Sequence, residues 1–228
     1  MVLAQEYAGG RGMSPLRTET RPFEAAPPRV ARDLSDLPTY GFGPKSPMWW
    51  GTLGFFIIEG MAFALALATY FYLVQQNAQW PLAPVPPDHW VGTLNTALLL
   101  ASLWPNFVAD RDAHREDLTR VRRDLVIMSL IALVTVALRL YEFAGLGVRW
   151  DQNAYGSITW VLLALHLTHL ITDAGDTLVL TALMFTRHAK GSAKGKRFSD
   201  VSDNAFYWYF VVGSWLPIYL TVYWLPRW

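Results

Sequence analysis

The sequence GTLGFFIIEGMAFALALATYFYL (Gly51–Leu73) determines the fold class of this chain. Between Leu53 and Val74 the only acidic or basic residue is Glu59. An apolar stretch of this length matches the roughly 20 residues that an α-helix needs to cross the hydrocarbon core of a bilayer. We therefore predict a transmembrane helix at 53–74 and an integral membrane protein.

Four further apolar stretches follow, and they predict helices at 93–109, 125–145, 155–185 and 205–225. The stretch 93–109 is short and carries Pro105 near its end, where the missing N–H and the ring are expected to kink a helix. Together the five ranges predict an all-α, polytopic membrane protein with five transmembrane helices.

The first 47 residues have a different composition, because they contain seven of the 14 prolines. Such a segment cannot bury enough apolar surface to offset its ordering entropy. It also lacks the apolar run of about 7 to 15 residues that a signal peptide needs. We expect a retained, mostly extended, cytoplasmic tail at 1–47 and a transmembrane domain at 48–228.

Positive charge predicts the orientation of the helices. Of the 19 Lys and Arg residues, 16 fall in the tail and in the loops after the second and fourth predicted helices. Arg149 and Arg227 lie in the other connections, and Arg139 lies within a helix. Because Lys and Arg are retained on the cytoplasmic side, we expect the amino terminus in the cytoplasm and the carboxyl terminus outside.

Composition and motifs exclude several classes of function. Charged residues make up 16% of the chain, below the roughly 25% of a soluble domain. The absence of cysteine excludes disulfides, iron–sulfur clusters and thiol nucleophiles, and a net charge of +1 argues against a nucleic-acid partner. No phosphate-binding glycine loop, GxSxG or HExxH motif is present, so we expect no catalytic residue in this chain.

Glu59 is predicted near the bilayer midplane, where an ionised carboxylate is costly unless it is paired or protonated. It must therefore face protein. One interpretation is a proton-antenna or proton-relay carboxyl; the other, which we favour, is a neutral acid that hydrogen-bonds a neighbouring helix. Small residues at Gly60, Ala64 and Ala68 form a row that would let another helix approach closely.

Four polar residues share one face of the predicted helix 155–185, because His166, His169, Asp173 and Asp176 are spaced by three, four and three. This spacing would let His169 hydrogen-bond Asp173. A zinc or non-haem iron site is one hypothesis. We favour an inward polar stripe without metal, because the chain has only five histidines and two histidines on one helix face cannot clamp a haem.

Arg139 and Glu142 lie three residues apart in the predicted helix 125–145. At this spacing the two side chains meet on one face of the helix and can form an ion pair. Such a pair hides both charges from lipid, so we expect a structural role for it.

On these residues the chain resembles the subunit III family of the haem–copper oxidases, most closely cytochrome c oxidase subunit III. Gly51–Leu73 is similar to the family's helix of aromatic and small residues with one buried glutamate, which Glu59 would match, and TLNTALLLAS (Thr93–Ser102) is similar to its LNT-x-x-LL-x-S stretch. RLYEF (Arg139–Phe143) resembles its Q-x-x-E-aromatic element, and FYWYFVVGSW (Phe206–Trp215) its last helix. His166 and His169 fall on its H-x-x-H pair.

The chain also departs from the family pattern. Arg139 replaces a glutamine, Asp173 stands where a glycine is usual, and Tyr209 and Val212 replace a histidine and an aspartate. The larger members of the family have seven helices. The five helices predicted here would correspond to a form without the first two, as in shorter bacterial members. We therefore expect the inner membrane of a bacterial cell.

The resemblance implies a non-redox subunit of a proton-pumping terminal oxidase in aerobic respiration, with cytochrome c as electron donor. Haem and copper would reside in subunits I and II. This chain would contact both, mainly subunit I, hold phospholipid and support proton uptake. Two alternatives remain: a related subunit of a quinol oxidase or nitric-oxide-reductase system, and a small proton-coupled transporter.

Overall fold

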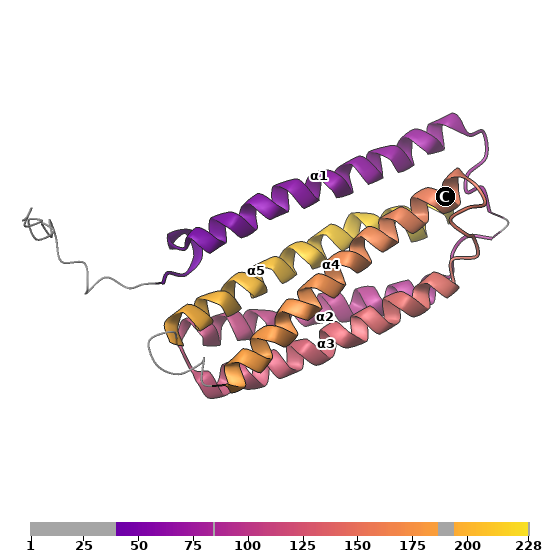
Figure 1. Cartoon of the computed structure of the whole chain (residues 1–228). Helices are drawn as coiled ribbons and strands as arrows, with labels where there is room; N and C mark the ends of the chain where they lie inside the picture. The colour runs from indigo at the N-terminus through magenta and orange to yellow at the C-terminus, as the bar shows by residue number, and fades with distance from the viewer. Residues whose placement is uncertain (1–39, 84, 187–193, 228) are drawn as a thin grey trace, which may run out of the picture. The chain divides into compact units, whose positions relative to one another are not determined.

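The structure is a computed structural model that describes residues 40–83, 85–186 and 194–227. It contains five long helices, α1 (Pro47–Gln76), α2 (His89–His114), α3 (Leu118–Ala144), α4 (Ala154–Phe185) and α5 (Lys194–Tyr219) (Figure 1). A π-helical turn, η4 (Leu220–Trp224), and a 3-10 turn, η5 (Leu225–Arg227), follow α5. The described residues form no β-strand, and all five helices are long and apolar enough to span a membrane. The predicted all-α, five-helix fold is confirmed.

The helices extend beyond the apolar ranges that predicted them. The second continues past Pro105 to His114 rather than ending near residue 109, and the fifth begins at Lys194 rather than at residue 205. Hydropathy marks only the lipid-facing core of a helix, whereas backbone hydrogen bonds continue through the polar turns on either side. At the start of α3, Asp117 accepts hydrogen bonds from the N–H groups of Thr119 and Arg120 and so caps the helix.

Helices α2, α3, α4 and α5 form a bundle in which α2 packs against α3 and α5, and α4 also packs against α3 and α5. The core of this bundle includes two of the largest fully buried side chains, Trp208 and Trp215. The Trp208 indole N–H donates to Ser102 Oγ and the Trp215 indole N–H donates to Thr96 Oγ1. These bonds join α5 to α2 without leaving a buried indole donor unpaired.

Helix α1 packs differently, because among the long helices it packs mainly against α4 and α5 (Figure 1). Its contact stripe includes aromatic residues seven apart, Trp49, Phe56, Phe63 and Tyr70. Phe63 and Tyr70 are its only buried residues. Within the described residues no helix covers Ala64 or Ala68, which are exposed, whereas Gly60, the first residue of the small-residue row, is half-buried beside Phe210 of α5.

Successive helices alternate in direction, so α1, α3 and α5 begin at one end of the bundle (Figure 1). We call this the basic end, because it carries many of the basic residues: Lys45, Arg111, Arg115, Arg120, Arg122, Arg123, Lys196 and Arg197. The segregation of charge that the sequence predicts is therefore present in the structure. The opposite end carries Arg149 and Arg227.

The segment just before α1 is fixed to the basic end. The Tyr40 hydroxyl donates to Glu116 Oε1, and Ser199 Oγ donates to the Gly41 carbonyl at 2.6 Å. The hydrogen bond to the Glu116 carboxylate raises the pKa of Tyr40. Residues 1–39, which hold most of the predicted tail, lie outside the described part of the chain.

Candidate functional site

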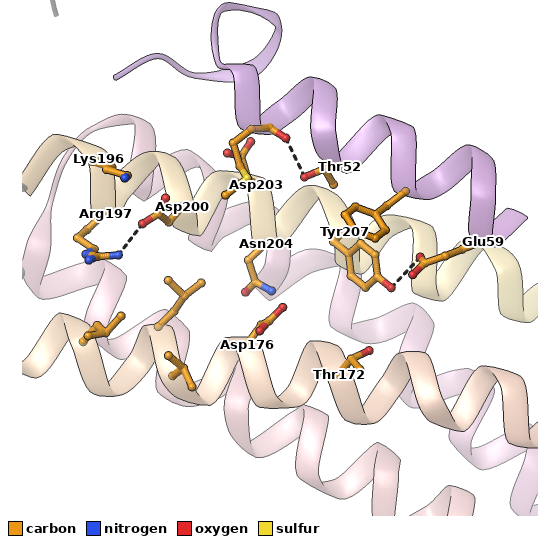
Figure 2. Close-up of a pocket in the computed structure, with 15 residues that line it drawn as sticks. Thr52, Glu59, Thr172, Asp176, Lys196, Arg197, Asp200, Asp203, Asn204 and Tyr207 are labelled. Atoms are coloured by element: carbon orange, nitrogen blue, oxygen red, sulfur yellow. Dashed lines mark hydrogen bonds and ion pairs between the residues drawn. The ribbon is translucent and has the colours of Figure 1, made fainter. Parts of the chain in front are cut away.

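Glu59 lies in the interior of α1, and its side chain and that of Tyr207 on α5 point toward each other (Figure 2). The Tyr207 hydroxyl donates to Glu59 Oε2 at 2.9 Å, and His169 Nε2 on α4 lies 3.6 Å from the same oxygen. The Glu59 side chain is 24% exposed. One carboxyl therefore joins the three helices α1, α4 and α5.

Aromatic side chains hold this carboxyl in place. Phe56 stacks on Phe210 of α5 with ring centroids 4.7 Å apart, and Phe63 contacts the His169 ring at 4.8 Å. Phe56 and Phe63 are three residues before and four residues after Glu59, so all three share one face of α1. Packing of these rings on α4 and α5 directs the Glu59 side chain toward both helices.

Beside Glu59, helices α1, α4 and α5 line a cleft of about 630 Å³ that extends toward the basic end (Figure 2). Its apolar lining comes from Met48, Phe55, Val179, Leu180 and Leu183. Its charged lining comes from Glu59, Asp176, Asp200, Asp203, Lys196 and Arg197. A cleft with apolar walls and charged groups toward one end suits an amphiphile better than a fully polar ligand.

The polar face of α4 is divided between the bundle and this cleft. Asp173 is 1% exposed and accepts a hydrogen bond from Asn204 Nδ2 at 3.3 Å, while the amide oxygen of Asn204 accepts from Thr177. Asp176, one turn along, lines the cleft instead. The predicted hydrogen bond between His169 and Asp173 is wrong, because His169 Nδ1 donates to the Leu165 carbonyl and Nε2 faces α1.

Arg139 and Glu142 form a second buried polar group. The Arg139 side chain is fully buried, and its Nη1 lies 2.6 Å from Glu142 Oε2 in the ion pair that the sequence predicts. The Tyr223 hydroxyl donates to the other carboxylate oxygen. The Arg139 guanidinium lies 3.5 Å from the centre of the Trp215 ring, a cation–π contact that adds to the attraction of the carboxylate.

His166 belongs to this second group. Its Nε2 contacts the Val211 carbonyl at 3.0 Å, and a carbonyl can only accept, so Nε2 carries the proton. Nδ1 is then free to accept from Arg139 Nη2 at 3.4 Å. The histidine pair of α4 is thus separated: His166 takes part in the Arg139 network, whereas His169 contacts Glu59.

Within the described residues, no three His, Asp or Glu side chains are grouped so that they could hold a metal ion. The cleft does bring together two of the predicted residues, Glu59 and Asp176, while Arg139 and Glu142 lie in a separate cluster. The absence of a metal site from this chain stays a prediction.

Sequence reasoning missed the partners of the predicted residues. Tyr207 and Tyr223 carry the hydrogen bonds to Glu59 and Glu142, and Asn204 carries the one to Asp173. All three lie on α5 or its continuation. The only signal in the sequence was the high density of Tyr and Trp in 205–225, which does not say which residue meets which carboxyl and does not include Asn204.

Comparison with known proteins agrees with this architecture. The family model for cytochrome c oxidase subunit III matches residues 45–227. The chain is similar to cytochrome c oxidase subunit 3 of Thermostichus vulcanus, with 25% identity over 177 residues that cover 78% of this chain and 87% of the relative.

Two further relatives come from distant organisms. A probable cytochrome c oxidase subunit 3 of Nocardia farcinica is 28% identical over 182 residues, covering 76% of this chain and 85% of the relative. Cytochrome c oxidase subunit 3 of Petromyzon marinus is 28% identical over 177 residues, covering 74% and 66%. Because the family match spans all five helices, the chain belongs to the cytochrome c oxidase subunit III family.

Proposed function

We propose that this chain is a non-redox subunit of a proton-pumping terminal oxidase that transfers electrons from cytochrome c to oxygen. In that role it stabilises subunit I, contacts subunit II, holds phospholipid and sustains proton uptake by the complex. Haem and copper are expected in the partner subunits. The observation that carries the proposal is the cleft beside Glu59, opened between α1 and the bundle and lined by apolar side chains.

The size and lining of the cleft support the lipid part of the proposal. A cleft of about 630 Å³ falls within the range of small-molecule sites. Phe55 on one wall faces Val179, Leu180 and Leu183 on the other, so an acyl chain would replace water against apolar carbon on both sides. A bound lipid would then fill the space between α1 and α4 and fix the position of α1.

Glu59 supports the proton part of the proposal less directly. His169 Nδ1 donates to a backbone carbonyl, so a neutral His169 presents a bare Nε2 toward Glu59 Oε2, 3.6 Å away. Attraction between the two groups then requires a proton on one of them. We favour a structural role for Glu59, in which this proton makes the contact with His169 attractive and the carboxyl holds α1 against α4 and α5.

Purification of the chain from its native membrane in mild detergent tests the proposal. We expect haem a, copper and cytochrome c oxidation activity to co-purify with it in fixed ratio. Co-purification with a quinol-oxidising or nitric-oxide-reducing complex would replace the electron donor in the proposal. A chain that is active alone in substrate uptake would favour the transporter alternative.

We further propose that the basic end lies in the cytoplasm of a bacterial cell, which places the amino terminus inside and the carboxyl terminus outside. The chain has no cysteine, so single introduced cysteines report without background. A cysteine in residues 75–90 should react with an impermeant thiol reagent added from outside, and one in residues 110–120 should not. Labelling of both from the same side would contradict the orientation.

A further inference from the structure

A second, much smaller cavity lies inside the bundle of α2, α3, α4 and α5. The space in it that is open to the centre of a water molecule is about 10 Å³. All four helices line it, α2 through Asn106, α3 through Met128, α4 through Asp173 and Thr177, and α5 through Asn204 and Trp208. This volume is close to the minimum that holds one water molecule and far below that of a site for an organic ligand.

The lining of this cavity is partly polar. Asn106, Asp173 and Thr177 are buried there, and Asn204 joins them from α5. Cavities that stay empty in proteins are apolar, whereas a polar cavity of sufficient size holds water. A bound water makes about three hydrogen bonds, so four polar side chains from three helices are enough to hold one.

Asp173 is the residue of this set that lacks a partner. Its Oδ1 accepts from Asn204 Nδ2 at 3.3 Å, whereas no donor reaches its Oδ2 within the described residues. In that part of the chain it forms no ion pair, and the charged group close enough to act on it is another carboxyl, that of Asp176. A buried carboxyl oxygen without a partner is costly.

The neighbouring polar groups already bond elsewhere. Asn106 Nδ2 donates to the Ala205 carbonyl at 2.9 Å, and Thr177 Oγ1 donates to Asn204 Oδ1 at 3.1 Å. A partner for Asp173 Oδ2 must therefore come from outside the chain. Water fits either protonation state of Asp173, because it donates to a carboxylate and accepts from a carboxylic acid.

We propose that this cavity holds one structural water molecule, hydrogen-bonded to Asp173 Oδ2 and to the polar side chains of α2 and α5 beside it. The water completes a polar contact that joins α2, α4 and α5 inside the bundle. Asn204 lines both this cavity and the cleft, so its side chain lies between the water and the cleft (Figure 2). The inference goes beyond the proposed function and does not depend on which complex contains the chain.

X-ray radiolysis of the complex purified from its native membrane tests this inference. Irradiation converts bound water to hydroxyl radicals, which oxidise the side chains next to them before they can diffuse away. Met128 and Trp208 line the cavity and are only 5% and 1% exposed, so bulk water hardly reaches them. A water in the cavity should nevertheless make both of them oxidise.

The chain offers a matched control for each of these two residues. Met184 and Trp215 are at least as deeply buried and line neither the cavity nor the cleft. Peptide mass spectrometry should show Met128 oxidised several times faster than Met184, and Trp208 several times faster than Trp215. Met184 lies beside the last residue of α4, where bulk water would favour the control. Equal rates within each pair would mean a dry cavity and would overturn the proposal.

Two variants of Asp173 test whether this residue holds the water. Asp173→Leu removes the polar group and fills the space, so oxidation of Met128 and Trp208 should fall to the rates of their controls. Asp173→Asn keeps the size and a polar end, so the faster oxidation should persist. Unchanged oxidation in the leucine variant would refute the assigned partner. The ratio of this chain to its partner subunits checks assembly, and the comparison within the unaltered complex decides the presence of water even if a variant does not assemble.

Electron cryo-microscopy of the same complex, at a resolution that shows ordered water, locates the molecule directly. We expect one density peak in the cavity within hydrogen-bond distance of Asp173 Oδ2. A cavity without density, or a peak beyond the reach of Asp173, would contradict the proposal.

Discussion

Glu59 and Glu142 are both glutamates within membrane-spanning helices, yet their surroundings differ. Glu142 is 2% exposed, paired with the guanidinium of Arg139 and hydrogen-bonded by Tyr223. Glu59 has a 24% exposed side chain, a hydroxyl donor in Tyr207 and a neighbouring histidine, and it lines the cleft. The first site is closed and neutralised within the chain, whereas the second is open to a ligand.

The packing of the helices explains this difference. Glu142 lies on α3, inside the bundle of four helices, and Tyr223 of η4 closes the space beside it. Glu59 lies on α1, which buries only Phe63 and Tyr70. Where one stripe of a helix makes all its contacts, a polar residue at the edge of that stripe remains accessible.

Removal of the cation from the closed site should have the largest effect. Arg139→Ala leaves Glu142 in a buried site without its counter-charge, and breaking such a pair costs about 3 to 5 kcal/mol of unfolding free energy. Unfolding by sodium dodecyl sulfate in mixed micelles measures the loss. Arg149→Ala is the control: it removes an exposed arginine at the end opposite the basic end, and it should change the free energy of unfolding little. Equal stability of the two variants would show that Arg139 is not a structural partner.

A double variant that lacks both charges should lose less unfolding free energy than the sum of the losses in the two single variants. In Arg139→Gln with Glu142→Gln neither buried charge is left alone, so the double variant should be more stable than the sum of the single variants by about 1 to 3 kcal/mol. The same unfolding titration on all four proteins gives this coupling energy. Additive effects would mean that the short contact contributes nothing to the stability of the closed site.

At the open site the shape of the side chain should matter more than its charge. Glu59→Ala removes the acceptor of Tyr207 and leaves a void, so it should weaken attachment of α1 or of the subunit by about 1 to 3 kcal/mol. Glu59→Gln keeps both shape and acceptor, and we expect normal assembly and turnover. Oxygen consumption and proton release across pH measure this. A strong loss of sustained turnover in Glu59→Gln at unchanged subunit stoichiometry would instead make Glu59 a proton relay.

The smallest expected effect is the difference in stability between variants of the two histidines, one at each site. His166 is fully buried in the closed site and His169 borders the open one, so His166→Ala should destabilise the chain more than His169→Ala. Replacement of both should leave the haem and copper content of the complex unchanged if the subunit stays associated. Metal analysis of the intact complex measures this, and loss of one equivalent would identify a ligand role.

The fold was predictable where the deciding forces are local. Apolar length predicts five spanning helices, because each must satisfy its own backbone hydrogen bonds in lipid. The contact between Arg139 and Glu142 was also predictable, since a spacing of three residues places both side chains on one helix face. Family membership followed from motifs spread over these same helices, and the comparisons confirm it.

The boundaries of α5 and the partners of the carboxyls were not predictable in this way. The first turns of α5 carry Lys196, Arg197 and Asp200, so they do not register as apolar although they are helical and line the cleft.

By itself, then, the sequence determined the number of spans, the segregation of basic residues to one end, and which side chains carry charge into the membrane. Only the tertiary structure decided that Tyr207 meets Glu59, that Tyr223 meets Glu142, and that α1 packs on α4 and α5 through one stripe with a cleft beside it. The physical reason is that contacts between helices depend on how each helix is rotated and tilted against its neighbours. That choice is made by packing of the whole bundle, and no single stretch of sequence contains it.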